Sequence, residues 1–177
     1  MGSGLGGGSS DGAHVLKLLN ALFDLQHNAG QLIRYAGEIG SDCAFFIENQ
    51  PQFASGKGDC LELAEVDLHG LYLVIVMPGV HVSTPEAYKM VKPHTPEHPL
   101  FEVIHRPVEE WKNLLVNDFE APVCEKYPVI SAIKHQLYQA GAIYASMSGS
   151  GSAVFGLFKE IPEMGDFAAY RHWFGKL

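Results

Sequence analysis

Two glycine- and serine-rich stretches are the parts of this 177-residue sequence best suited to chemistry. The first runs from Gly4 to Ser10 and leads directly into a segment with helical apolar spacing. Glycines let backbone N–H groups converge, and the start of the following helix adds partial positive charge, so such a stretch can cradle an anion. A flexible linker has the same composition, and the residues alone leave both interpretations open.

Two named phosphate-binding motifs fit this first stretch poorly. The P-loop requires a Gly-Lys-Ser/Thr sequence, and no lysine precedes Lys17. Residues 2–7 satisfy G-x-G-x-x-G, but the dinucleotide fingerprint follows a strand, for which there is no room here. A Rossmann-type site is therefore not indicated.

The second stretch, Ser148 to Ser152, lies between two apolar segments typical of strands. By itself it predicts a tight hairpin turn. Two such loops in one small protein nevertheless suggest a shared anionic ligand. Neither loop contains G-x-S-x-G, which disfavours the nucleophile elbow of a hydrolase.

Asp42 and Tyr88 are single candidates with weaker signals. Asp42 lies between a helix end and an apolar run; such an aspartate is most often a turn or cap residue, and beside a phosphate site it would be a general base. Tyr88, four residues after Thr84, is either a packing residue or an aromatic platform for a base. His94 and His98 lie in a proline-rich loop and the other histidines are scattered, so no metal site is predicted.

Composition excludes several classes of protein. The formal net charge is −8, which favours neither a nucleic-acid partner nor an anionic membrane surface. The hydrophobic share of 47% is enough for a real core, and the longest apolar run, Leu71 to Met77, is far below the roughly 20 residues that span a bilayer. The sequence has no evident leader, and its three cysteines lack CxxC spacing, which predicts a reduced, cytoplasmic protein without bound metal.

The elements that position these residues mix helix and strand, which predicts an α/β or α+β protein. A first helix is expected from residue 10, capped by Ser9, Ser10 or Asp11, with one apolar face formed by Val15, Leu18, Leu19, Leu22 and Phe23. Further helices are expected over residues 30–40, from 84, and over 109–116, 129–140 and 167–174. Strands are expected at 45–47, 53–54, 60–63, 71–77, 142–147 and 153–158, with a hairpin turn at 55–59, a surface loop at 92–99 and a domain boundary near 67–70.

Six segments, taken together and in order, closely resemble the GHMP kinases, the family of galactokinase, homoserine kinase, mevalonate kinase and phosphomevalonate kinase. Within that family the resemblance is to the kinases that phosphorylate 4-diphosphocytidyl-2-C-methyl-D-erythritol. The Gly/Ser loop identifies only the superfamily, whereas GSDCAFF and VHVSTPEAY point to the particular member. The segments are GSGLGGGSSDGAHVLKLLNAL, EIGSDCAFF, FASGKGDCLE, PGVHVSTPEAY, NDFE and SMSGSGSAVFGLF.

The resemblance implies an α+β fold with an incomplete N-terminal S5-like catalytic domain over residues 1–68 and a ferredoxin-like C-terminal domain over 69–177. Its site roles are as follows. Asp42 would be the catalytic base toward the C2 hydroxyl of the substrate. Gly4, Leu5, Gly6, Gly7, Gly8, Ser9 and Ser10 would bind the ATP phosphates. Ser148, Gly149, Ser150, Gly151 and Ser152 would support that loop and the substrate phosphates. Thr84, Pro85 and Tyr88 would contact the cytidine. ATP and Mg²⁺ are the expected cofactors.

One departure from the family pattern bears on activity. GHMP kinases carry an N-terminal block with a lysine that pairs with the catalytic aspartate, and no residue here matches it. We therefore expect a truncated chain with an incomplete catalytic domain and a whole C-terminal domain. Its uncovered apolar surface favours a homodimer. Two alternatives stay open: a non-catalytic binding or oligomerisation fragment, and another GHMP kinase acting on homoserine or a mevalonate derivative.

Overall fold

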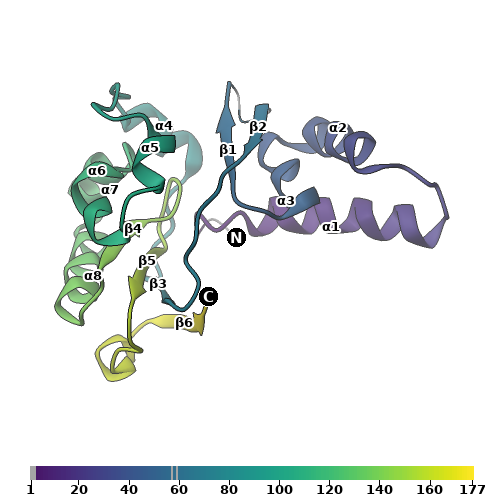
Figure 1. Ribbon diagram of the computed structural model, residues 1–177. Coiled ribbons are helices and arrows are strands. Elements are labelled where there is room, and N and C mark those ends of the chain that lie inside the picture. Colours follow the sequence, from purple (N-terminus) through teal and green to yellow (C-terminus); the bar gives the residue numbers. More distant parts are fainter. Residues whose placement is uncertain (1–2, 57, 59) are drawn as a thin grey trace. The chain divides into compact units, whose positions relative to one another are not determined.

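The computed structural model of the protein describes residues 3–56, 58 and 60–177 (Figure 1). These residues form two compact units: Gly6–Val66, and residues 3–5 together with Asp67–Leu177. Among the described residues, no helix combines the length and the apolar character that a membrane crossing requires. Helices and strands occur in both units, as expected for the α+β class.

The first unit is built on a long helix. Its elements are α1 (Gly7–Leu22), α2 (Ala29–Ile39), the 3₁₀ turn η1 (Ser41–Cys43), α3 (Phe45–Glu48), β1 (Gln52–Ser55) and β2 (Cys60–Leu63). Figure 1 shows α2 and α3 on the same side of α1. A small core of Ala13, Leu32, Ala36, Cys43, Ala44 and Ile47 joins the helices, and β1 pairs with β2 as the expected antiparallel hairpin. Residues 57 and 59 of its predicted turn lie outside the described residues.

Helix α2 forms where the spacing predicts it. Asn28 and Gln31 form a capping box, in which each side chain accepts a hydrogen bond from the other residue's backbone N–H at 3.0 Å. Leu32 and Ala36 are buried, one turn apart, against the core of the unit. The cap and the apolar face therefore agree on the position of this helix.

The second unit is an antiparallel sheet covered by helices. Its strands are β3 (Tyr72–Met77), β4 (Tyr144–Met147), β5 (Val154–Phe158) and β6 (Arg171–Lys176), in the order β4-β5-β3-β6. Between β3 and β4 the chain forms α4 (Thr84–Met90), α5 (Leu100–Ile104), η2 (Val108–Glu110), α6 (Trp111–Leu114), α7 (Glu120–Lys126) and α8 (Pro128–Gln139); η3 (Met164–Phe167) follows β5. Helix α8 packs on the sheet through Ile130, Ile133 and Leu137, which belong to the same buried core as Val74 and Val76 of β3.

Two local predictions are wrong. Residues 45–47 are the helix α3 and not a strand, because a short apolar run does not distinguish the two and Ile47 is buried against helices here. The expected C-terminal helix over 167–174 is instead η3 followed by the strand β6, which pairs along its whole length with β3. Such pairing between distant segments overrides local propensity.

The start and the packed face of α1 also differ from the prediction. The helix begins at Gly7, and its N-cap is Gly6, so none of Ser9, Ser10 and Asp11 is the capping residue. The packed side is marked by the buried Ala13, whereas the predicted apolar face is exposed, with Leu18 at 62% and Leu22 at 68%. Helix α1 is therefore apolar on two sides, and the elements of its unit cover only one of them.

Candidate functional site

The loop formed by residues 148–152 joins β4 to β5 and is closed by its own backbone. Ser148 N donates to Ala153 O at 2.8 Å, and Gly151 N donates to Ser148 O at 3.0 Å. Gly149 and Gly151 have φ values of 55° and 89°, a left-handed region that other residues rarely adopt. The glycines of this loop therefore serve its tight turn.

Residues 3–5 dock against this loop within the second unit. Ser148 Oγ donates to Gly4 O at 2.8 Å, and Ala153 N donates to Ser3 O at 2.9 Å. A Cβ atom on Gly4 would lie 2.1 Å from Ser148 O, and the φ of Gly4 is 75°, so only glycine fits there. The structure thus brings the start of the first predicted loop onto the second one, which a flexible linker would not do.

The loop presents backbone donors that the chain does not use. Within the described part of the chain, the N–H groups of Gly149, Ser150 and Ser152 donate no hydrogen bond. Successive unpaired backbone N–H groups of this kind form anion-binding concavities. Thr84 adds a hydroxyl beside them, with its Oγ1 3.4 Å from Ser150 Oγ.

Gly6 to Ser10 belong to the first unit, where they form the start of α1. Gly6 caps the helix in a left-handed conformation, and a Cβ atom there would lie 2.8 Å from the Phe46 ring. Gly7 and Gly8 have open space where a Cβ atom would be, and the first turn carries no acidic residue. Because first-turn N–H groups lack partners inside a helix, this end of α1 is an accessible, partly positive site for an anion.

Asp42 lies in η1, in the same unit as the start of α1. Its neighbour Cys43 is buried, with Sγ 3.6 Å from the position of a Cβ atom on Gly12 of α1. The Asp42 side chain is exposed, and within the described residues its carboxylate accepts one hydrogen bond, from Ser41 Oγ at 3.4 Å. The backbone at Gly58, on the tip of the β1–β2 hairpin, also comes close, since a Cβ atom there would lie 3.9 Å from Asp42 Oδ1. An exposed carboxylate held by a packed turn is suited to accept a proton.

Thr84, Pro85 and Tyr88 lie together on the short helix α4. Pro85 occupies the first turn, where its missing N–H costs no helical hydrogen bond. The Tyr88 side chain is 65% exposed, and its ring meets Phe119 edge to face with centroids 4.9 Å apart. A ring that is anchored at one edge and otherwise exposed can stack against a nucleobase.

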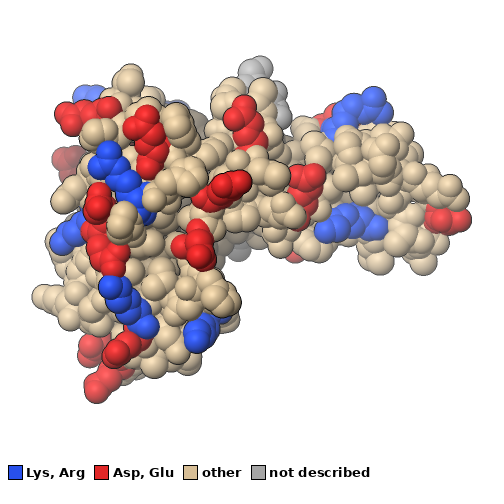
Figure 2. Space-filling view, viewed as in Figure 1, with Lys and Arg blue, Asp and Glu red and all other residues tan. Residues whose placement is uncertain are grey.

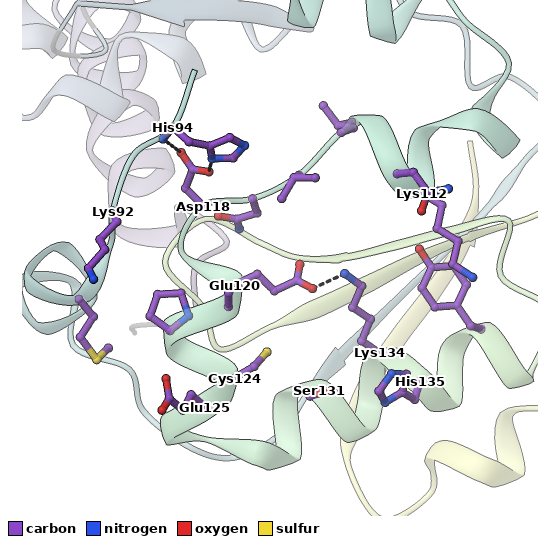
Figure 3. A pocket seen from close by; sticks show the side chains of 18 of the residues that line it. Lys92, His94, Lys112, Asp118, Glu120, Cys124, Glu125, Ser131, Lys134 and His135 are labelled. Carbon is purple, nitrogen blue, oxygen red and sulfur yellow. Dashed lines mark hydrogen bonds and ion pairs between the residues drawn. The ribbon is translucent and has the colours of Figure 1, made fainter. Parts of the chain in front are cut away.

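A cavity of about 1000 Å³ opens elsewhere in the second unit, beside α7 and α8 (Figure 3). None of the predicted site residues lines it. Among its polar lining residues, Glu120 pairs with Lys134 and His94 with Asp118. The predicted phosphate-binding and cytidine-binding residues of this unit are therefore outside the lining of the cavity, although the lining residue Asn117 contacts Gly149.

The perturbed titratable groups of this unit are structural. Burial raises the pKa of Tyr144 to about 12, and its hydroxyl donates to Leu115 O at 3.0 Å. Burial, followed by the nearby Glu120 charge, also raises the pKa of the Cys124 thiol. A raised thiol pKa disfavours the thiolate, so Cys124 is a poor nucleophile. The hydrogen bond from Lys126 lowers the pKa of Glu86 on α4.

Sequence reasoning missed two residues that contact the 148–152 loop or the strand before it. Asn117 Nδ2 donates to Gly149 O at 2.8 Å, and Glu120 Oε2 accepts from Met147 N at 3.2 Å. Both lie in the NDFE segment, which contributed to the family resemblance but received no role. The signal for a role was the presence of an amide and a carboxylate in a segment without its own secondary-structure pattern.

Two family models match this sequence, and together they cover more than half of it. The model described as GHMP kinases N terminal domain matches residues 1–56, and the model described as GHMP kinases C terminal matches residues 102–164. The resemblance derived from the motifs is confirmed by these matches.

Individual proteins agree with the family models. A 4-diphosphocytidyl-2-C-methyl-D-erythritol kinase of Bacteroides fragilis is 55% identical over 157 residues, which are 89% of this chain and 57% of that protein. The crystal structure of a 4-(cytidine 5'-diphospho)-2C-methyl-D-erythritol kinase matches with a TM-score of 0.79 and 30% identity, over 99% of this chain and 66% of that one. A homoserine kinase from Cytophaga hutchinsonii has a TM-score of 0.70 at 17% identity, and the match covers 100% of this chain and 67% of that one. This likeness concerns the fold alone.

The chain is shorter than the proteins it resembles. It spans 57% of the length of the Bacteroides fragilis kinase and 61% of a relative from Chlorobium phaeobacteroides that is 40% identical over 176 residues. Less than two thirds of each curated relative is therefore represented in this chain.

Proposed function

The chain belongs to the GHMP kinase family, and we propose from this membership that it is part of an ATP-dependent kinase for the 2-hydroxyl of 4-diphosphocytidyl-2-C-methyl-D-erythritol. The observation that carries the proposal is the glycine-built, acid-free N-terminus of α1 in the same unit as the exposed carboxylate of Asp42. The first supplies unpaired N–H groups for phosphate oxygens, and the second is a base. The product would be an intermediate of the non-mevalonate route to isoprenoid precursors.

In the proposed reaction Asp42 accepts the proton of the C2 hydroxyl. The hydroxyl oxygen then forms a bond to the γ-phosphorus of ATP while the bond from that phosphorus to the β,γ-bridging oxygen breaks, and ADP leaves. Catalysis of this kind depends mainly on position and on stabilisation of the phosphate charge. The N-terminus of α1, over Gly6 to Ser10, would stabilise that charge.

The 148–152 loop would contribute in two ways, by holding the start of the first glycine-rich stretch and by offering backbone N–H groups that the chain does not use. It holds Gly4, which precedes the Gly6 cap of α1 by two residues in the sequence. Its free N–H groups would receive phosphate oxygens of the diphosphocytidyl substrate. Thr84, Pro85 and Tyr88 would contact the cytidine, with the exposed Tyr88 ring stacking on cytosine.

Mg²⁺ is part of the proposal as the counter-ion of the nucleotide. No group of three or more His, Cys, Asp or Glu side chains among the described residues could hold a metal ion. Mg²⁺ often keeps several waters and binds nucleotide phosphates with only one or two protein ligands, which fits this chemistry. When bound, it would neutralise charge on the phosphates, and the half-buried Ser9 and Ser10 supply hydroxyl groups at the start of α1.

We further propose the cytoplasm as the compartment and a homodimer as the state of the isolated chain. None of the three cysteines forms a disulfide, as expected for a reducing compartment. The exposed apolar side of α1, with Leu18 and Leu22, supports the association of two copies.

The test compares Asp42→Asn with the unsubstituted sequence, in the protein translated from the complete reading frame that contains this chain. We expect kcat to fall by about 10²- to 10⁴-fold, the usual contribution of a general base, while the Kd for ATP changes little. Phosphate incorporation from ATP into the cytidine-linked substrate gives kcat, and calorimetric titration gives the Kd. Undiminished turnover would remove Asp42 from the mechanism.

Parallel assays with homoserine and mevalonate separate the specific proposal from another GHMP activity. Turnover of a substrate without a cytidine group, and none of the diphosphocytidyl compound, would move the assignment to another member of the family. Absence of phosphoryl transfer and of ATP binding in the complete protein would support a non-catalytic module instead.

A further inference from the structure

We propose that Asn117 and Glu120 form a brace that positions the 148–152 loop, acting as positioning residues and not as groups that touch the reacting atoms. The role of this brace in catalysis rests on the proposed function. Its physical part, the immobilisation of the loop, follows from contacts that all lie within the second unit.

Strand β4 needs such a brace because it is an edge strand. In the order β4-β5-β3-β6 it has a strand neighbour on one side only. Edge strands leave a row of unpaired N–H and C=O groups, which proteins usually cover. The loop follows directly from Met147, the last residue of this strand, so any freedom at the edge is transmitted to the loop.

Side chains take the place of the missing strand at alternate residues of β4. The Tyr138 hydroxyl donates to Ala145 O at 3.2 Å and accepts from Ala145 N at 3.1 Å. Two residues further on, Met147 N donates to Glu120 Oε2 at 3.2 Å, and Asn117 Nδ2 donates to Met147 O at 2.9 Å. Both polar backbone groups of Met147 are thus fixed by side chains of the NDFE segment.

Asn117 also reaches into the loop itself. The same Nδ2 donates to Gly149 O at 2.8 Å, so one amide group joins the end of the strand to the middle of the turn. Its Oδ1 accepts from Phe119 N at 3.0 Å, which fixes the orientation of the side-chain amide. The two bonds from Asn117 to Met147 and Gly149 use its two amide hydrogens, which neither Asp nor Ala can supply.

Glu120 is fixed from the side opposite the loop. Its Oε1 accepts from Lys134 of α8 (Figure 3), and its Oε2 also accepts from Ser146 Oγ at 3.0 Å. Because both carboxylate oxygens have partners, the charge is compensated and the side chain is held in place. The brace therefore connects α8, the start of α7 and the end of β4 to the loop.

Two matched pairs of variants test the brace in this 177-residue chain. Asn117→Asp removes both donated hydrogen bonds and places carboxylate oxygens against two carbonyl groups, whereas Asn113→Asp makes the same change on an exposed residue of α6 with no side-chain hydrogen bond among the described residues. Glu120→Gln has its control in Glu125→Gln, an exposed residue of the same helix.

The measurement is backbone hydrogen exchange, resolved by residue, in the absence of ligand. We expect Asn117→Asp and Glu120→Gln to accelerate exchange by about tenfold or more at the N–H groups of this segment that donate hydrogen bonds, which are those of Met147, Ser148, Gly151 and Ala153. The strands β3 and β5 should keep their rates, and both controls should behave like the parent. Equal acceleration throughout the sheet would show a general loss of stability and overturn the proposal. Unchanged rates at 147–153 would overturn it as well.

Titration with ATP separates this proposal from the proposed function. Loop release in the variants, together with no ATP binding by the parent chain, would leave the brace standing and weaken the kinase assignment for this chain. ATP binding by the parent, with unchanged loop exchange in both variants, would leave the kinase assignment standing and refute the brace. Loop release together with a weaker ATP affinity in both variants supports the two proposals at once.

Discussion

At the scale of the residue, hydrogen bonding explains how the core of the second unit accommodates a buried ionisable side chain. Tyr144 is 4% exposed, and its hydroxyl donates to Leu115 O. Burial disfavours the phenolate, so the pKa is raised to about 12. Tyr144 is therefore a neutral hydrogen-bond donor that ties β4 to the segment before Asn117.

This pKa predicts a loss of stability at alkaline pH. The unfolded tyrosine ionises near pH 10, whereas the folded one keeps its proton to about pH 12. With respect to this group, the free energy of unfolding keeps its full value below pH 10. It falls by about 2 to 3 kcal/mol as the pH rises toward 12. Tyr144→Phe, which lacks the ionisable group, should show a shallower decline in urea unfolding between pH 9.5 and 12.

The control for this prediction is Tyr88→Phe, because the Tyr88 ring is mostly exposed. Its decline with pH should parallel that of the parent chain. At pH 8 the Tyr144→Phe variant should already be less stable by about 1 kcal/mol, from the hydrogen bond to Leu115 O. Identical pH slopes for Tyr144→Phe and the parent would show that this tyrosine is not linked to alkaline unfolding.

At the scale of the element, the sequence correctly predicts the helices and strands whose positions are determined by local signals. The apolar spacing over residues 30–40, the helix start at Thr84-Pro85 and the turn residues between β1 and β2 each place their element correctly. Local signals do not reveal that β6 pairs with β3, because the partner lies about a hundred residues away and supplies the stability.

The candidate site could likewise be predicted only where its signals are local in the sequence. Both glycine-rich loops are evident in the sequence, and in the structure Gly4, Gly6, Gly149 and Gly151 have the positive φ values that favour glycine. Their contact is not evident, since the hydrogen bond from Ser148 to Gly4 joins residues 144 positions apart. The brace residue Asn117 escaped prediction for the same reason, because its two acceptors lie 30 and 32 residues further on.

The first turn of α1 should show a conflict between helix stability and ligand binding. Gly8→Ala introduces a methyl group where no atom lies within 4 Å, and alanine favours a helix over glycine by about 0.8 to 1 kcal/mol. We expect Gly8→Ala to raise the midpoint of thermal unfolding while weakening ATP binding, because the methyl group occupies space beside the proposed phosphate position. Thermal melts and calorimetric titration with ATP measure the two effects.

Gly4→Ala is the contrasting change. Its methyl group would collide with Ser148 O and its backbone would be strained, so stability should fall and residues 3–5 should leave the loop. A Gly8→Ala chain that is both more stable and binds ATP as well as the parent would argue against phosphate binding at the start of α1.

At the scale of the whole molecule, the chain carries two matched family domains and yet less than two thirds of the length of its curated relatives. On the face shown in Figure 2, acidic and basic side chains are interspersed over the surface of both units, and uncharged surface lies between them along the region of α1 and α2. The exposed apolar residues of α1 are Val15, Leu18, Leu19 and Leu22. Contiguous exposed apolar surface of this kind commonly marks an interface.

Self-association of the isolated chain through this side of α1 is the resulting prediction. Leu18 and Leu22 are one turn apart and are 62% and 68% exposed, so burying them against a second copy removes apolar area from water on both chains. Sedimentation velocity over a range of concentrations should show association of the parent chain, and the double variant Leu18→Lys, Leu22→Lys should sediment as a monomer with an unchanged helical circular-dichroism signal. The double variant Asn113→Lys, Gln139→Lys adds the same two charges to exposed residues of the second unit and should leave association intact. A parent chain that remains monomeric at every concentration would refute this interface, and dissociation by the Asn113→Lys, Gln139→Lys variant as well would show that net charge, and not the apolar stripe, controls the association.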